Sequence, residues 1–184
     1  MKKSKEIYDL EHAYKNLENI NIWINNSDTK SSIMLGLVGV VFTILFSNSK
    51  FIDSMIKVVT NCCVKITFSD LLYLLMTAIS LMILFSGIYM LIKVLIPKLK
   101  LNINNNDSVI YFGSIGKYES VNDFKGKALC IKKEELLDDL LNQIYINSKI
   151  CMKKFNNYND GIRSLIVGII SFVLLYLIGL FIYL

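Results

Sequence analysis

Three long stretches of the chain contain only uncharged, mostly apolar residues. They cover residues 31–49, 71–92 and 164–184. A helix that rises about 1.5 Å per residue needs about 20 residues to cross a hydrocarbon core about 30 Å thick, and each stretch has about that length. The pattern therefore predicts three transmembrane helices. It favours an integral membrane protein over a secreted enzyme or a soluble nucleic-acid-binding protein.

Two polar segments next to these stretches carry a helical repeat. Mostly apolar residues recur every three or four positions in residues 6–25, with one polar position at Asn21, and again in residues 134–155; this is a heptad spacing. In the second segment the repeat consists of Leu137, Leu141, Ile144, Ser148, Cys151 and Phe155. We therefore predict an N-terminal helix and a second, long amphipathic helix. Two compatible explanations of the repeats remain open, packing within a small cytoplasmic core and homo-oligomerisation through the repeat. We predict that the protein is a homo-oligomer.

The segment between the second and third stretches also contains a candidate strand. Residues 109–112 are β-branched or aromatic and lie between Asp107 and Gly113, a pattern typical of a short strand. The Asn-rich residues 101–107 before them predict a loop. The predicted fold is a mainly α membrane protein with three transmembrane helices and a cytoplasmic N-terminal helix. A small cytoplasmic insert, made of the short strand and the long amphipathic helix, lies between spans two and three.

These elements divide the chain into six segments and suggest their placement. The segments are a cytoplasmic amphipathic helix at 1–30, transmembrane helix 1 at 31–49, an outer loop at 50–70, transmembrane helix 2 at 71–92, a cytoplasmic region at 93–163 and transmembrane helix 3 at 164–184. The first and fifth segments hold most of the 20 basic residues. Because basic loops stay in the cytoplasm, we predict a multi-pass protein whose N-terminus is cytoplasmic.

Composition and charge narrow the function classes. Hydrophobic residues make up 54% of the chain, the mean hydropathy is +0.49 and the net charge is +5. No Asp, Glu, Lys, Arg or His lies within the three stretches. Ion-coupled transporters usually carry such residues at membrane depth, so the sequence argues against one.

Small and polar residues within the stretches have simple structural explanations. The hydroxyl groups can each bond to the backbone of their own helix; they belong to Thr43, Thr77, Ser80, Ser86 and Ser171. Glycines permit close helix packing, although none forms a G-x-x-x-G motif; they are Gly36, Gly39, Gly168 and Gly179.

Residues typical of an active site or a metal site are sparse. His12 is the single histidine and no Cys-x-x-Cys occurs, so a zinc site is not indicated. Residues 113–117 resemble a phosphate-binding loop but lack its spacing. The acidic residues at 134, 135, 138 and 139 complement the dipole at the start of a helix. We predict no catalytic residues, no metal and no cofactor, and a protein that is not an enzyme.

Charged residues gather near the cytoplasmic start of the first span. Asp28 and Lys30 precede this span, while Lys153 and Lys154 lie on the helix that leads toward the third span. One aspartate beside several cations fits a charge-pairing clamp. The alternative is a set of independent lysines that extend to the surface.

Three motifs occur in a fixed order along the chain. They are residues 22–31, which lead into Gly36; residues 110–115; and the amphipathic residues 140–154. Together with the three spans, they resemble the transmembrane effectors of Pycsar-type bacterial anti-phage systems. The first motif is similar to the family's Ala-Asp-x-Lys-Ala sequence, with Ser27 and Ser31 in place of the alanines.

The resemblance implies a function that periodicity alone does not give. In such systems a partner cyclase makes a cyclic nucleotide on phage infection, and the effector senses it and impairs the bacterial inner membrane, which causes abortive infection. The implied partners are the lipid bilayer and a cyclic nucleotide, most simply a cyclic mononucleotide, and no nucleic acid. Residues 93–163 then become a sensing and assembly region. Two other classes stay open, a small holin-like pore and a membrane scaffold protein, neither of which binds a nucleotide.

One part of the insert has the residue types that a cyclic mononucleotide requires. Its phosphate needs a cation and backbone N–H donors, and its base needs a stacking ring. Tyrosine, glycine and lysine residues between positions 111 and 118 provide these groups: Tyr111, Gly113, Gly116, Lys117 and Tyr118. The alternative explanation is a strand and turn whose rings fill the small core.

Overall fold

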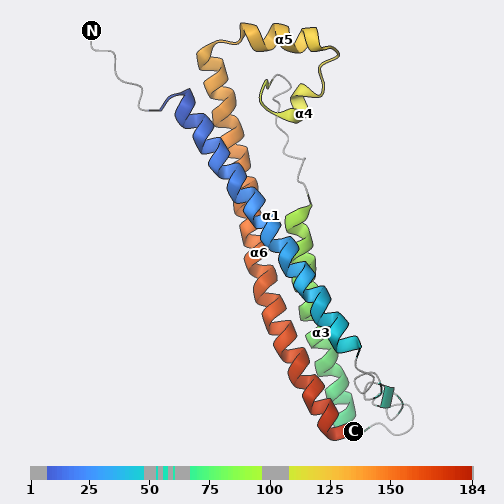
Figure 1. Cartoon of the computed structure of the whole chain (residues 1–184). Helices are drawn as coiled ribbons and strands as arrows, with labels where there is room; N and C mark the ends of the chain where they lie inside the picture. Colours follow the sequence, from blue (N-terminus) through green and yellow to red (C-terminus); the bar gives the residue numbers. More distant parts are fainter. Residues whose placement is uncertain are drawn as a thin grey trace. The chain divides into compact units, whose positions relative to one another are not determined.

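The computed structural model describes residues 8–47, 53, 56, 57, 60, 67–96 and 108–183. Within these residues the chain is mainly helical, as predicted (Figure 1). The helices are α1 (Leu10–Phe46), α3 (Phe68–Leu95), α4 (Phe112–Ile115), α5 (Val121–Cys130) and α6 (Lys133–Tyr183). Helices α1, α3 and α6 are each long and apolar enough to cross a membrane. The predicted outer loop at 50–70 lies mostly outside the described residues, and the predicted loop at 101–107 lies wholly outside them.

The starts and ends of the long helices follow from local chemistry. Asp9 caps α1, because its Oδ1 accepts a hydrogen bond of 3.0 Å from the backbone N–H of His12. Thr67 and Asp70 form a capping box at the start of α3. Helix α3 ends shortly before Pro97, a residue type that disfavours helical backbone in the residue preceding it.

Both amphipathic segments continue into an apolar stretch without a break. Helix α1 includes most of the predicted N-terminal helix and the first span, and α6 includes the predicted amphipathic helix and the third span. The chain divides into two compact units. The polar unit consists of residues 1–26 and 97–153, and the apolar unit consists of residues 27–96 and 154–184. Helices α1 and α6 each contribute to both units.

The polar unit has a small hydrophobic core between the first turns of α1 and α6. Ala13, Leu17 and Leu140 are buried there. The surrounding side chains are partly buried; they belong to Leu10, Ile110, Leu137 and Ile144. Part of the predicted heptad repeat therefore packs inside the chain.

The short strand predicted at residues 109–112 is wrong. The hydroxyl oxygen of Ser108 accepts hydrogen bonds from the backbone N–H groups of Ile110 and Tyr111, at 3.2 and 2.9 Å. These bonds form a turn that leads directly into α4. A strand needs a paired neighbour, and the described residues contain no strand at all. The insert instead contains α4 and α5, and Ser120 caps the second of these helices.

The core of the apolar unit lies between α1, α3 and α6. Its buried residues are Val38, Leu84, Leu91 and Leu165. Helices α3 and α6 approach closely at glycines. A Cβ at Gly168 would lie 2.8 Å from the Leu84 Cα, and a Cβ at Gly87 would lie 2.8 Å from the Leu165 backbone nitrogen.

The other predicted glycines behave in two ways. A Cβ at Gly179 would fall on the Tyr73 hydroxyl, so the prediction of close packing is confirmed there as well as at Gly168. Gly36 and Gly39 of α1, by contrast, have open space where a side chain would stand. Gly161 of α6, which the sequence analysis does not single out, also lies at the contact between α3 and α6. A Cβ added there would lie 3.2 Å from the Gly87 carbonyl oxygen.

Hydroxyl groups in the apolar unit mostly bond to their own helix, as predicted. Thr43, Thr77, Ser86 and Ser171 each donate to a carbonyl three or four residues earlier. Ser80 departs from the prediction, because its hydroxyl lies 2.8 Å from that of Ser171 and donates to a carbonyl of α6. This hydroxyl therefore links α3 to α6.

Candidate functional site

A buried carboxylate lies in the polar unit, at Asp139 of α6. This side chain is only 9% exposed. Its Oδ2 accepts hydrogen bonds from the Ser108 hydroxyl at 2.9 Å and from the Val109 backbone N–H at 3.0 Å. The Ser108 hydroxyl also accepts hydrogen bonds from the backbone N–H groups of Ile110 and Tyr111. The Asp139 carboxylate therefore anchors the start of the segment at residues 108–118 to α6.

Two buried polar atoms on this face of α6 are unused. The Oδ1 of Asp139 and the Nε2 of Gln143 have no hydrogen-bond partner among the described residues. Gln143 is 4% exposed and lies four residues after Asp139, so the two side chains are one turn apart on the same helix face. An unpaired buried polar atom costs about 1–3 kcal/mol. The described part of the polar unit therefore contains an acceptor and a donor that it does not satisfy itself.

The first residues of the predicted ligand segment lie beside this anchor. Tyr111 directly precedes α4 and is half-buried, and its ring centroid lies 4.9 Å from that of Phe112. Gly113 faces the same tyrosine, because a Cβ there would stand 2.5 Å from a Tyr111 ring carbon. The absence of a side chain at this position thus makes room for the tyrosine ring.

The remaining residues of that segment follow α4. Gly116 and Lys117 are exposed. Tyr118 is half-buried, with its ring edge-on to Phe124 of α5 at a centroid distance of 5.6 Å. Both tyrosine rings therefore have aromatic neighbours, and the assignment of these residues to a ligand site stays a prediction.

The predicted charged cluster is partly formed in the apolar unit. Lys154 donates a hydrogen bond to Asp28 Oδ1 and forms an ion pair with it, and these side chains are 12% and 34% exposed. Lys30 and Lys153 are exposed. The structure thus brings together α1 and α6 through one cation rather than several.

Two buried serines lie on the α1 face next to this pair. Ser27 and Ser31 flank Asp28, with 1% and 0% of their surface exposed. The Ser31 hydroxyl has no hydrogen-bond partner among the described residues. Small residues at these positions let α1 pack closely against its neighbours. Alanines, which the Pycsar-type effectors have at the similar positions, would do the same.

The predicted oligomer repeat divides into two groups. Leu137 and Ile144 pack on the core of the polar unit, and Cys151 is half-buried. Leu141 and Ser148 are exposed. The exposed pair lies on the surface of the polar unit, where it is free to contact a second copy, and oligomerisation through it stays a prediction.

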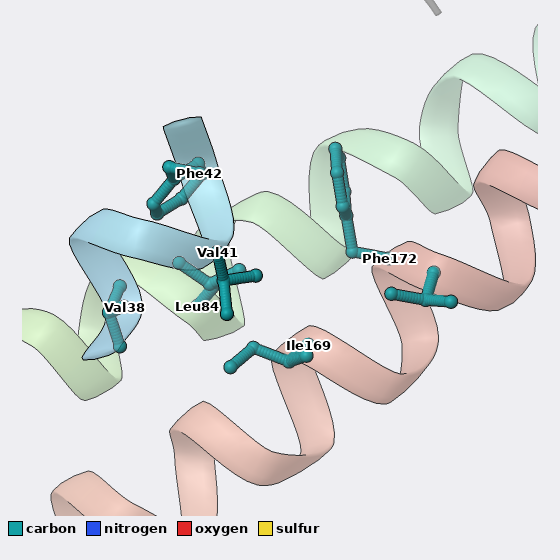
Figure 2. A pocket seen from close by; sticks show the side chains of 7 residues that line it. Val38, Val41, Phe42, Leu84, Ile169 and Phe172 are labelled. Carbon is teal, nitrogen blue, oxygen red and sulfur yellow. The ribbon is translucent and has the colours of Figure 1, made fainter. Parts of the chain in front are cut away.

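An apolar pocket lies in the apolar unit, between three helices (Figure 2). Its empty volume is ≈ 240 Å³, including space open to its surroundings. The lining side chains are Val38, Val41, Phe42, Leu84, Ile169, Phe172 and Val173. None of these side chains has a polar atom, so the pocket offers nothing to a phosphate or a base.

Sequence reasoning missed the polar group around Asp139. The sequence pattern places that residue among several acids at the start of a helix and indicates no further role for it. A signal was available in Gln143, which lies three residues after the buried Leu140 and therefore on the apolar face of α6. A polar side chain at such a position needs a partner or a function.

Comparison with known proteins identifies the family. The chain matches the family described as the Pycsar effector protein domain over residues 12–182. It is also 33% identical over 186 residues to the Pycsar effector protein GmPycTM of Gulbenkiania mobilis, with 95% of this chain and 93% of that protein covered. No solved structure matches the chain. The family match extends over nearly all the described residues of both units, and the chain therefore belongs to the Pycsar effector family.

Proposed function

We propose that this chain is a membrane effector that senses a cyclic nucleotide and then impairs the bacterial inner membrane. A partner cyclase makes the nucleotide during phage infection, and the loss of membrane function stops the infected cell before the phage matures. The observation that carries this proposal is membership of the Pycsar effector family, which supports an anti-phage effector role. The three helices that are long and apolar enough to cross a membrane support the membrane part of it.

The two units have different tasks in this proposal. The polar unit, placed in the cytoplasm with the N-terminus, binds the nucleotide, and the apolar unit forms the membrane part. Helices α1 and α6 each run from one unit into the other without a break in their hydrogen-bonded backbone. In this proposal a change in the polar unit reaches the apolar unit along these two helices.

The ion pair between Asp28 and Lys154 acts as a clamp in the resting state. It joins α1 to α6 in the apolar unit, next to the boundary with the polar unit. Lys154 is mostly buried, so loss of its partner would leave a charge in a poorly solvated place. Activation separates the two helices here. The effector works as a homo-oligomer and without catalytic residues of its own.

Measurement of membrane potential in bacteria tests this function. The chain is expressed alone and with cyclases that each produce one cyclic mononucleotide. The proposal expects the potential to collapse only with a matching nucleotide, and cells that carry the cyclase alone serve as the control. Collapse without any nucleotide would favour a holin-like pore. Unchanged potential with every nucleotide would favour a scaffold protein.

A further inference from the structure

The unused polar atoms of the polar unit point to a specific contact with the nucleotide. We infer that Asp139 and Gln143 form a subsite for the hydrogen-bonding edge of a nucleobase, and that the segment beginning at Ser108 closes this subsite in the present state. The inference rests on the proposed function, because it assumes that the ligand is a nucleotide. It adds the part of the ligand that is recognised and the side chains that recognise it.

The chemistry of the two atoms matches a base edge. The Asp139 Oδ1 is an acceptor and the Gln143 Nε2 is a donor, and neither has a partner among the described residues. Every common nucleobase presents an N–H donor next to an oxygen or nitrogen acceptor on its pairing edge. The base N–H can donate to the carboxylate while the neighbouring base atom accepts from the amide. Each unused atom then gains the partner that it lacks.

The charge of Asp139 excludes the phosphate from the same place. A cyclic mononucleotide has one negative phosphate, and a buried carboxylate repels it in surroundings that screen charge poorly. The base therefore points toward α6 and the phosphate away from it. Other parts of the polar unit carry the cations that a phosphate needs, among them the exposed Lys117.

The subsite is closed in the structure. Asp139 and Gln143 are 9% and 4% exposed, so a base cannot reach them unless a covering segment moves. The segment that begins at Ser108 is held to Asp139 by the two hydrogen bonds to Oδ2, from a hydroxyl and from a backbone amide. Binding must break or rearrange these contacts. The same movement gives the polar unit two states, one closed and one with the base bound.

A buried water molecule is the simpler occupant of such a position. Water needs two or more polar partners, and the two unused atoms can provide them. In that case the pair has a structural role only. Its variants would then change the stability of the protein and leave the affinity for nucleotides as it is.

Calorimetric titration of the purified full-length protein in detergent distinguishes these possibilities. The ligands are the cyclic mononucleotides of adenine, guanine, cytosine and uracil. In Asp139→Asn the Val109 N–H donates to the amide oxygen, so the amide NH2 takes the place of Oδ1. Two donors, this NH2 and the base N–H, then face each other, and we expect binding to be at least about 10-fold weaker. Gln143→Met keeps the side-chain size but removes the donor, with a similar loss. The matched controls Asp138→Asn and Asn142→Met alter adjacent positions and should bind as the parent does.

Ser108→Ala gives the result that a purely structural role would not produce. This variant removes one of the bonds that hold the segment closed, so we expect it to bind the nucleotide more tightly, by about 3- to 10-fold. If the parent binds a nucleotide and Asp139→Asn and Gln143→Met bind it equally well, the subsite is refuted while the proposed function stands. Should Asp139→Asn fail to fold, Gln143→Met decides. If the parent binds none of the four ligands, both the subsite and the nucleotide-sensing function are overturned.

Discussion

The two units of this chain differ in whether their buried polar atoms have hydrogen-bond partners. In the apolar unit the hydroxyls of Ser80 and Ser171 bond to each other, and the Tyr73 hydroxyl donates to a carbonyl of α6. In the polar unit a carboxylate and an amide, those of Asp139 and Gln143, each keep one atom without a partner among the described residues. The hydroxyls link helices to one another, whereas the unpaired atoms of Asp139 and Gln143 can still form hydrogen bonds with a bound molecule.

This difference agrees with a division between a packed membrane part and a sensing part. Buried atoms that satisfy one another stabilise a single arrangement, and those left unpaired weaken it until a ligand arrives. Among the described residues of the apolar unit there is one exception, the hydroxyl of Ser31, which has no hydrogen-bond partner there. It lies three residues after Asp28, beside the ion pair that we propose to open. The exception therefore also lies at a place where movement is expected.

The largest effect is expected at the glycine contact between α3 and α6. A side chain at Gly168 would meet the backbone of Leu84, which cannot move aside as a flexible side chain can. Gly168→Leu should therefore prevent the apolar unit from folding, because a clash with backbone costs more than the about 1–3 kcal/mol that is usual for overpacking. Accumulation in membranes and thermal unfolding in detergent measure this loss.

Gly36→Leu is the matched control for that variant. It makes the same substitution on α1, where nothing lies within 4 Å of the added Cβ. The variant should fold and insert as the parent does. If Gly36→Leu and Gly168→Leu lower stability equally, the close α3–α6 contact does not hold the apolar unit together.

The next largest effect separates core packing from assembly in the heptad repeat. Ile144 packs on the core of the polar unit, while Leu141 is 41% exposed. Ile144→Lys places a charge against this core and should lower the free energy of unfolding by about 1–3 kcal/mol. Leu141→Lys should leave unfolding unchanged, yet abolish toxicity and reduce the oligomer size measured by light scattering. A Leu141→Lys variant that assembles and kills like the parent would show that the repeat serves only internal packing.

A smaller effect is expected from the ion pair in the apolar unit. Asp28→Asn removes the partner of Lys154 and should favour the open state by about 1–2 kcal/mol. The nucleotide dose for half-maximal loss of membrane potential should then fall about 10-fold, because 1.4 kcal/mol corresponds to a factor of 10. The matched control is Lys153→Met, which removes the exposed neighbouring cation. An unchanged dose response together with poor accumulation would assign a structural role alone to Asp28.

The smallest effect concerns the cap of α1. The backbone and ring N–H groups of His12 lower the pKa of Asp9 below its usual value of 3.8. A carboxyl whose pKa is lowered by folding stabilises the folded state above its unfolded pKa, and that contribution is lost as the pH falls through the folded value. Asp9→Ala should thus lower the unfolding temperature slightly at pH 7. The difference in unfolding temperature between Asp9→Ala and the parent should shrink below about pH 4. An equal difference at pH 7 and below pH 4 would show that the charge of Asp9 does not stabilise the fold.

The sequence was sufficient for the long helices because their apolar stretches are uninterrupted by charge. It failed at residues 109–112, where β propensity was overridden by the side chain of Ser108, which takes the amides that a strand would use. Asp139 and Gln143 were missed for a related reason. The segment that bonds to Asp139 begins about 30 residues earlier in the chain, and helical periodicity describes only one helix at a time.

We propose that a cyclic nucleotide bound to the polar unit makes the membrane part permeable. The most direct test of this proposal uses the purified protein in liposomes that hold a potassium diffusion potential, which is read with a voltage-sensitive dye. We predict that a matching cyclic mononucleotide collapses the potential with the parent and with Asp138→Asn, and that Asp139→Asn needs at least about 10 times more nucleotide. A potential that decays at the same rate with and without nucleotide would contradict the claim.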